Sequence, residues 1–190
     1  MPIEIEAKLK VDSHEAVRST LAAAGAECVG RALEENHIFD SADRTLLAAD
    51  RGLRVRVCRD DAGQIVSTTV TYKGPRTDSR FKTRPEIQFH ADDDRAAVDF
   101  LRAIGFAEAL CFEKRRESWQ LRDCRIELDE LPHLGLYVEI EGPSESAVAA
   151  VQNAIGLGHL PHEPRSYIAL LVEYCRERGL PATAITFGAA

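Results

Sequence analysis

Charged and apolar residues alternate with a period of two along several short segments of the chain. The clearest is Ile3–Val11 (IEIEAKLKV), in which Glu4, Glu6 and Lys8 share one parity and apolar residues occupy the other. Successive side chains of a β-strand point to opposite faces, so this segment predicts a strand with one ionic and one apolar face. The pattern recurs in Leu53–Val57, Thr71–Lys73, Arg84–Phe89, Lys114–Arg116, Arg125–Asp129 and Val138–Glu141.

The charged positions of these segments would share one face if the strands joined one sheet. That face would carry Glu4, Glu6, Lys8, Arg54, Arg56, Lys73, Arg84, Glu86, Lys114, Arg116, Glu127, Asp129, Glu139 and Glu141. A single strand of this kind usually has a solvated face, so a scaffold barrel with solvated charges is the structural alternative. Seven such segments, with nearly every one of these positions a full charge, favour a closed sheet with an ionic lumen.

Helical periodicity, with Ser or Asp at the start and Gly just past the end, marks four other segments. They are residues 13–24, 93–104, 144–155 and 166–178. Three of these helices follow an acidic strand segment, which indicates a repeated unit of a strand and its covering helix. We therefore predict an α+β fold over residues 1–190 as a single domain, namely a closed antiparallel eight-stranded β-barrel (tunnel) with helices packed outside. A barrel of about eight strands holds side chains or one small ligand.

Composition restricts the classes of partner. The chain has 190 residues, 45% of them hydrophobic, and a formal net charge of −7. This charge disfavours nucleic acid and an anionic membrane as partners, because both need an exposed basic surface. No apolar stretch suits a signal peptide or a membrane span, so we expect a cytoplasmic protein. The oligomeric state is left open, with a homodimer as one hypothesis.

Cysteine and histidine usage gives no sign of a metal site. The five cysteines are an odd number without CxxC spacing, which argues against a disulfide framework and against a thiolate zinc site. The six histidines are scattered, with only His159 and His162 close together. We therefore expect any metal site in this protein to use oxygen ligands.

The predicted lumen needs a ligand of both signs, because buried charges require partners. Carboxylates lie on the terminal strands of the chain and bases on the middle ones, which predicts two separate walls. A divalent cation bound to a polyphosphate would match both. Mg²⁺ or Mn²⁺ takes carboxylate and phosphate oxygens, and Arg binds phosphate bidentately.

One segment, Glu4-Ile5-Glu6-Ala7-Lys8, is similar to the ExExK signature of the CYTH superfamily. These triphosphate tunnel metalloenzymes include class IV adenylyl cyclases, thiamine triphosphatases and inorganic triphosphatases. The resemblance extends in order through residues 36–40, 53–56, 71–75, 82–86, 113–116, 127–129 with Gly135, 139–142 and 165–167. It thus covers residues 1 to about 175.

The resemblance implies a role for each charged residue. One or two divalent metals, Mg²⁺ or Mn²⁺, would be held by Glu4, Glu6, Asp129, Glu139 and Glu141. The triphosphate would be bound by Lys8, Arg54, Arg56, Lys73, Arg84, Lys114 and Arg116. Glu86 and Glu127 would support neighbouring bases, and Lys73 and Glu139 are the candidate catalytic residues.

The resemblance leaves the reaction open between two chemistries. Attack of the ribose 3′-hydroxyl of ATP on the α-phosphate gives cyclic AMP and pyrophosphate, and the motifs favour this class IV cyclase reaction slightly. Attack of water would instead hydrolyse inorganic triphosphate or thiamine triphosphate, with Lys73 as a base if neighbouring cations lower its pKa. A non-catalytic sensor of nucleotide or polyphosphate is the rival from another class.

The segment His37-Ile38-Phe39-Asp40 departs from the family pattern. Many members have an aromatic residue before the Phe-Asp pair, so an aromatic lid contributed by this segment is in doubt. Tyr167 could instead belong to a cover over the tunnel, and core packing is the alternative that we favour.

Overall fold

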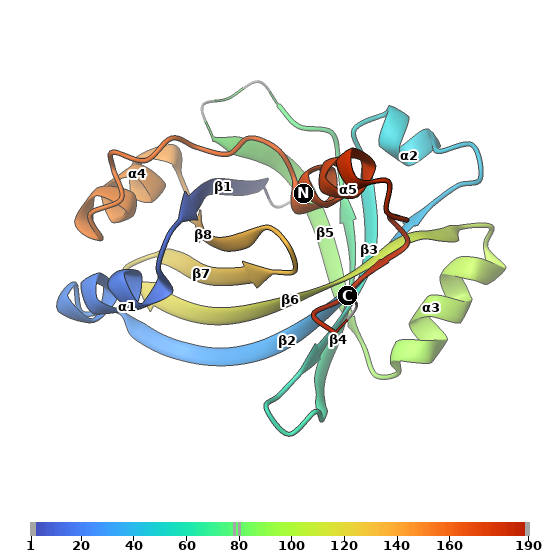
Figure 1. Ribbon diagram of the computed structural model, residues 1–190, viewed down its shortest axis with the longest axis horizontal. Helices are drawn as coiled ribbons and strands as arrows, with labels where there is room; N and C mark the ends of the chain where they lie inside the picture. The colour runs from blue at the N-terminus through green and yellow to red at the C-terminus, as the bar shows by residue number, and fades with distance from the viewer. Residues whose placement is uncertain (1–2, 78, 80, 189–190) are drawn as a thin grey trace.

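A closed β-barrel forms the centre of the computed structural model, which describes residues 3–77, 79 and 81–188 (Figure 1). The order of the strands is β2-β3-β4-β5-β1-β8-β7-β6, all neighbours are antiparallel, and β6 pairs back onto β2. The predicted α+β fold with a closed eight-stranded tunnel is confirmed. The strands are β1 (Ile3–Val11), β2 (Glu27–Asp40), β3 (Gly52–Arg59), β4 (Ile65–Lys73), β5 (Lys82–Ala91), β6 (Ala107–Leu121), β7 (Cys124–Leu131) and β8 (Gly135–Glu141).

The two longest strands, β2 and β6, close the barrel. Their pairing runs from Glu27 opposite Gln120 to Asp40 opposite Ala107, and the register shifts between Ile38 and Phe39. Closure leaves none of the eight strands with an unpaired edge along the ring. A short strand, β9 (Ala184–Ile185), pairs parallel with β6 outside this ring and was not predicted.

All four predicted helices are present. They are α1 (His14–Ala23), α3 (Asp94–Ala103), α4 (Glu145–Ala154) and α5 (Tyr167–Arg178). A Ser or Asp side chain accepts a backbone N–H at the start of each, as Ser166 does from Ala169 in α5. Gly179 ends α5 in the left-handed conformation with φ of 65°, where glycine lacks the steric penalty of other residues.

A fifth helix, α2 (Thr45–Ala48), was not predicted. The carboxylate of Asp40 at the end of β2 accepts the backbone N–H groups of Leu46 and Leu47, at 3.0 and 3.1 Å. The residue that stabilises the start of α2, Asp40, thus precedes the helix by several positions. Neither helical periodicity nor a capping residue directly before it marks it in the sequence.

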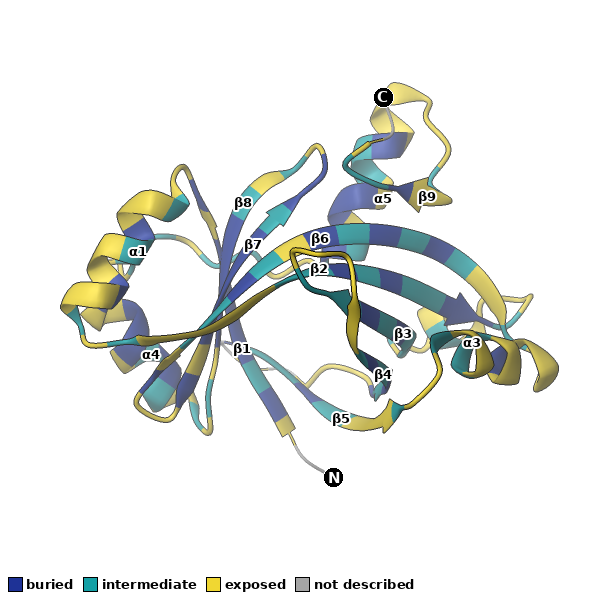
Figure 2. Ribbon diagram, turned by 90° about the horizontal axis from the view of Figure 1, so that it is seen from below, coloured by how far each residue is buried: buried dark blue, intermediate teal, exposed yellow. Residues whose placement is uncertain are grey.

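The apolar parity of the strands packs against the helices. Leu21 of α1 and Val148 of α4 join a buried cluster with Ile126 of β7 and Ile140 of β8. Leu101 of α3 belongs to a second cluster over β3 and β4. Along the middle of β2 and β6, Figure 2 shows buried (dark blue) bands separated mainly by intermediate (teal) ones. With the apolar parity outside, the charged parity of the same strands is turned into the lumen.

Within the described ranges, none of the helices is long and apolar enough to cross a membrane. The cytoplasmic location expected from the sequence stays a prediction, as do the homodimer and the single domain over residues 1–190.

Candidate functional site

One cavity of about 340 Å³ occupies the lumen of the barrel. The predicted inward-facing charges line it, with the exception of Asp129. They are Glu4, Glu6, Lys8, Arg54, Arg56, Lys73, Arg84, Glu86, Lys114, Arg116, Glu127, Glu139 and Glu141. The period-two pattern thus brings residues from seven strands to a single space.

The predicted segregation of acids and bases holds in part: the strands that carry most of the lumen carboxylates, β1, β8 and β7, are neighbours, as are β3 and β4, which carry Arg54, Arg56 and Lys73. Bases also enter the acidic side, because β5 lies between β4 and β1. Its register sets Arg84 opposite Glu4 and Lys82 opposite Glu6, while β8 sets Glu139 opposite Lys8. Positions along the chain do not reveal these neighbours.

Three carboxylates, Glu4, Glu6 and Glu141, meet where β1 pairs with β8, and we call them the carboxylate cluster. Glu6 and Glu141 are directly opposite each other in the register. Lys82 Nζ lies 3.0 Å from Glu6 Oε1 and Lys73 Nζ lies 2.7 Å from Glu4 Oε1. In the part of the chain that the structure describes, Glu141 has no cation within 4.0 Å, and the buried Glu4 Oε2 accepts no hydrogen bond. The carboxylate cluster therefore carries more negative charge than its neighbours neutralise.

The pKa of Glu141 reports this excess. Glu141 retains access to solvent at the end of β8. Desolvation against the neighbouring strands, together with the negative charges of Glu4, Glu6 and Glu86, raises the pKa of its carboxyl to about 7. A bound cation would remove the repulsion between these carboxylates.

Lys73 lies between two carboxylates. Its Nζ is 2.7 Å from Glu4 Oε1 and 2.7 Å from Glu86 Oε2. The hypothesis that Lys73 acts as a base required neighbouring cations, and the charges in contact with it are anions. Glu86 thus contacts this ammonium, and its supporting role stays a prediction.

A second group of charges, the ion-pair network, consists of Glu34, Lys114, Arg116 and Asp129. The carboxylate of Asp129 accepts two hydrogen bonds from Arg116, at 2.7 and 2.6 Å, and one from Lys114 at 3.1 Å. Asp129 is 0% exposed and does not line the cavity. Its oxygens are therefore occupied by bases, which leaves it poorly placed for the predicted role of metal ligand.

Glu34 completes the ion-pair network from β2 and was not predicted. It lies 3.0 Å from Arg56 Nη1 and 3.2 Å from Lys114 Nζ. Burial alone would raise the pKa of Glu34, but the charges of Arg56, Lys114 and Arg116 outweigh it and lower that pKa. Burial, reinforced by Arg116, in turn lowers the pKa of Lys114.

Glu139 links the two groups. Its Oε2 lies 2.6 Å from Arg116 Nη2, and its Oε1 lies 3.4 Å from Lys8 Nζ. Lys8, Lys114 and Arg116 overcome the effect of burial and lower the pKa of Glu139 well below its usual range. Glu139 is therefore ionised and reaches the cavity, unlike Asp129.

Arg54 is the base with the least compensation. In the described part of the chain no carboxylate lies within 4.0 Å of it, and its buried Nε donates no hydrogen bond. Burial and the charge of Arg56 lower the pKa of Arg54 to about 10, which still leaves it charged at pH 7. Its neighbour Arg56 is held by Asn36 and Glu34. Arg54 Nη2 donates to the hydroxyl of Thr71 at 3.4 Å, so an anion in the cavity would find this guanidinium without an ion-pair partner.

Two predicted residues have structural partners. The guanidinium of Arg84 donates to the carbonyls of Gly74 and Asp50, with Nε 2.8 Å from the oxygen of Gly74. Glu127 accepts from the hydroxyl of Ser118 and lies 3.8 Å from Arg116 Nε. Arg84 thus fixes the loop after β4. Glu127 lies beside an arginine, the arrangement that its predicted supporting role requires.

Tyr167 at the start of α5 belongs both to the core and to the cavity wall. Its ring meets that of Tyr137 edge to face, with centroids 5.3 Å apart, and its hydroxyl donates to Asp129 at 2.9 Å. The ammonium of Lys8 lies 3.9 Å from the ring centroid. Ile38 lines the cavity, whereas His37 of the same segment is paired with Glu108. Residues 37–38 therefore supply no aromatic lid, and Tyr167 packs in the core while its ring also lines the cavity.

The residues present fit a hard divalent cation beside a polyanion. The carboxylate cluster supplies oxygens, the ligands that Mg²⁺ and Mn²⁺ prefer, and has unneutralised negative charge. Arg54 supplies an unneutralised positive charge in the same cavity. A ligand that carries only one sign would leave one of these charges unpaired.

Comparison with known proteins agrees with this geometry. The model of the CYTH domain family matches residues 2–167. A protein of Methanocaldococcus jannaschii named "Putative adenylate cyclase MJ0240" is 32% identical over 139 residues, which make up 73% of this chain and 76% of that protein.

Solved structures are similar over nearly the whole chain. The PH1819 protein from Pyrococcus horikoshii OT3 has a TM-score of 0.76 at 28% identity, over 90% of this chain and 99% of that one. HpAC1 from Hippeastrum, named a "putative adenylyl cyclase" and described as having a dominant triphosphatase activity, has a TM-score of 0.64 at 18% identity, over 95% and 97% of the two chains. At that identity the likeness to HpAC1 is one of fold alone.

Proposed function

Because the chain belongs to the CYTH domain family, we propose that it is a divalent-metal-dependent enzyme that acts on a triphosphate substrate inside its tunnel. We favour a class IV adenylyl cyclase-like reaction, from ATP to cyclic AMP and pyrophosphate. The observation that carries this proposal is the presence of an unneutralised carboxylate cluster and an unneutralised arginine, Arg54, in one cavity.

The metal would be held by Glu4, Glu6 and Glu141, with Glu139 at the edge of the group. A bound Mg²⁺ or Mn²⁺ would withdraw negative charge from phosphoryl oxygens. Asp129, a predicted ligand, has a different role in this proposal. Because its oxygens accept from Lys114 and Arg116, it positions those two bases toward the cavity.

The triphosphate would be bound by bases from several strands. Arg54 and Arg56 of β3 face the same cavity as Lys8, Lys114 and Arg116. Guanidinium groups bind phosphate oxygens bidentately, and preorganised cations stabilise the charge that develops in phosphoryl transfer. Lys73, between Glu4 and Glu86, would contribute its ammonium as an electrostatic group close to the metal, which replaces the base role considered from the sequence.

The cavity also has an apolar part, which favours an organic triphosphate over inorganic triphosphate. Ile38, Leu53, Phe112 and Ile168 line it together with the charges. An inorganic triphosphate has no group that these side chains would desolvate favourably. A nucleoside would bury apolar surface against them, at about 25 cal/mol per Å².

The alternative is hydrolysis of a triphosphate, the activity described for the Hippeastrum protein of similar fold. The two reactions use the same metal and the same phosphate contacts and differ in the nucleophile. A sensor without turnover is the third candidate, and the carboxylate cluster speaks against it, because a binder of anions gains nothing from added negative charge.

A panel of substrates tests the proposal. The purified protein is incubated with Mg²⁺ or Mn²⁺ and with ATP, inorganic triphosphate or thiamine triphosphate, and cyclic AMP, pyrophosphate and phosphate are measured separately. Equal amounts of cyclic AMP and pyrophosphate from ATP are expected. Release of phosphate instead would establish the hydrolase, and tight binding of all three compounds without product would overturn the enzymatic proposal.

A further inference from the structure

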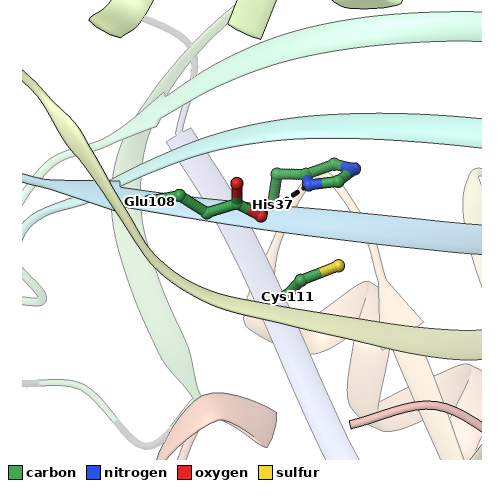
Figure 3. A group of neighbouring side chains, drawn as sticks. All are labelled: His37, Glu108 and Cys111. Atoms are coloured by element: carbon green, nitrogen blue, oxygen red, sulfur yellow. Dashed lines mark hydrogen bonds and ion pairs between the residues drawn. The ribbon is translucent and has the colours of Figure 1, made fainter. Parts of the chain in front are cut away.

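A histidine, a carboxylate and a cysteine meet on the outer face of the barrel, away from the tunnel. They are His37 of β2 and Glu108 and Cys111 of β6 (Figure 3). One ligand atom from each lies within 4.8 Å of the others. The side chains of His37 and Glu108 are 22% and 27% exposed, and Cys111 is half-buried, so the group is open to solvent.

The register of the closing seam explains why these residues meet. His37 and Cys111 are direct partners across β2 and β6, and both have the parity opposite to Ile38 and Phe112, which line the tunnel. Strict alternation would turn Glu108 to the other face from Cys111. The register shift pairs Ile38 with Leu110 but Phe39 with Glu108, so Ala109 is the extra residue of a bulge. Bulges re-aim side chains in this way.

The carboxylate of Glu108 is held in place from two sides. Its Oε1 lies 2.8 Å from His37 Nδ1, and its Oε2 lies 3.2 Å from Nη2 of Arg102 on α3. Arg102 is not itself a candidate ligand, and a ligand carboxylate with an outer partner of this kind is oriented before a metal binds. The group therefore has a fixed oxygen, an imidazole and a thiol on neighbouring strands.

We propose that His37, Glu108 and Cys111 bind a borderline divalent cation, with Zn²⁺ as the preferred ion, at a site separate from the tunnel. Nitrogen, oxygen and sulfur ligands suit Zn²⁺ and disfavour Mg²⁺, which prefers oxygen alone. The ligand atoms around a tetrahedral zinc ion lie roughly 3.3 to 3.8 Å from one another. Side-chain rotations that move these atoms by about 1 Å would complete the site. Water takes the fourth position, which the partial exposure leaves accessible.

Binding has two physical consequences. Burial, the carboxylate of Glu108 and two further glutamates raise the pKa of the Cys111 thiol to about 11, so the metal displaces a proton from sulfur as it binds. The metal also joins β2 to β6 across the seam that closes the barrel. It therefore stabilises the closed barrel.

Titration with Co²⁺ as a spectroscopic substitute for Zn²⁺ tests the site. The full chain is kept reduced with a phosphine, and excess Mg²⁺ occupies oxygen sites. We expect an absorption band from thiolate-to-Co²⁺ charge transfer that saturates at one equivalent and disappears when Zn²⁺ is added. Absence of this band in the wild-type protein would overturn the proposal.

Variants assign the band to the three residues. Cys111→Ser removes the band, and Cys28→Ser, which changes an exposed thiol on β2, the strand that carries His37, retains it. His37→Gln keeps the thiol and weakens Co²⁺ binding at least about tenfold. Zn²⁺ raises the melting temperature of the wild type and of Cys28→Ser but not that of Cys111→Ser. A band that survives in Cys111→Ser, or unchanged affinity in His37→Gln, would contradict the three-residue site.

Discussion

The ion-pair network and the carboxylate cluster both place buried negative charge at the same tunnel, but they differ in how far the protein neutralises it. In the ion-pair network, Asp129 accepts hydrogen bonds from Lys114 and Arg116, and its negative charge is neutralised within the protein. In the carboxylate cluster, Glu141 has no cation within 4.0 Å in the described part of the chain, and its pKa rises to about 7. The first group is complete without a ligand, and the second is not.

The difference separates residues that build the site from residues that are available to a ligand. A carboxylate whose oxygens are occupied can orient bases but has little left to offer a metal. A carboxylate repelled by its neighbours gains from a metal as soon as one arrives. Residue type and strand parity are the same in both groups, so only the partners distinguish the two roles.

The largest expected effect is on folding stability, for substitution in the ion-pair network. Asp129→Asn leaves Lys114 and Arg116 with an unpaired buried charge, which lowers the free energy of unfolding by about 3–5 kcal/mol. Glu141→Gln in the carboxylate cluster removes repulsion and leaves that free energy unchanged or higher. Urea unfolding of both variants in the presence of a chelator makes the measurement. Equal losses in the two would end the distinction between the groups.

Catalytic turnover should depend on the charges that face the ligand, Lys73 and Glu139. Lys73→Ala and Glu139→Gln each reduce kcat at least about 100-fold with the fold intact, because the first removes a cation close to the bound phosphates and metal, and the second removes the carboxylate that holds Arg116 and Lys8 at the edge of the metal group. Lys10→Ala is the matched control, since Lys10 is on the same strand and parity as Lys8 but does not line the cavity. The kinetics are accompanied by circular dichroism spectra. Wild-type rates in both variants would remove these residues from the site.

Metal affinity should depend on pH through Glu141. The folded-state pKa of about 7 lies above the usual glutamate value of 4.5, so without metal the contribution of this group to stability falls as pH rises from about 4.5 to 7. Mg²⁺ must displace its proton below pH 7. Affinity for Mg²⁺ then weakens by up to about tenfold per pH unit below 7 and is level above it.

Isothermal titration of Mg²⁺ between pH 5.5 and 8.5, conditions about 1.5 units on either side of that pKa, makes the measurement. The Glu141→Gln variant should bind more weakly at high pH and lose the dependence attributed to this group. A wild-type profile that Glu141→Gln reproduces would show that another group titrates.

The smallest expected effect concerns the hydroxyl of Tyr167. Tyr167→Phe removes one of the hydrogen bonds that Asp129 accepts, and Arg116 and Lys114 still hold the carboxylate. The free energy of unfolding should fall by about 1 kcal/mol. A loss as large as that of Asp129→Asn, measured in the same urea titrations, would mean that the tyrosine holds the ion-pair network together.

Much of this molecule follows from local pattern. Alternation along Ile3–Val11 determines which side chains face the lumen, and Ser166 and Gly179 bound the last helix as expected. These features depend on the geometry of one segment at a time. The closed barrel follows as well, because several strands share the same ionic parity.

Partnerships between strands could not be predicted in the same way. Glu34 was missed because the neighbouring inward positions of β2, Ala32 and Asn36, are uncharged and hide the alternation. The partners of Asp129 depend on the register of β6 with β7. His37, Glu108 and Cys111 meet on the outer face only because of the register of β2 with β6 and the bulge at Ala109. The sequence shows neither, so we expected only oxygen ligands in any metal site.

Closure of the barrel also has a consequence for how the protein folds. The pairing that closes the barrel sets Glu27 opposite Gln120 and Asp40 opposite Ala107. Strand β2 can therefore form this pairing only after β6, which follows it by many residues, is available. Contacts this distant in sequence make folding slow. Until β6 pairs with β2, the glutamates, lysines and arginines of the lumen remain hydrated. They lose this water only late in folding. Nascent chains that lack β6 therefore have an open, charged trough instead of a binding tunnel.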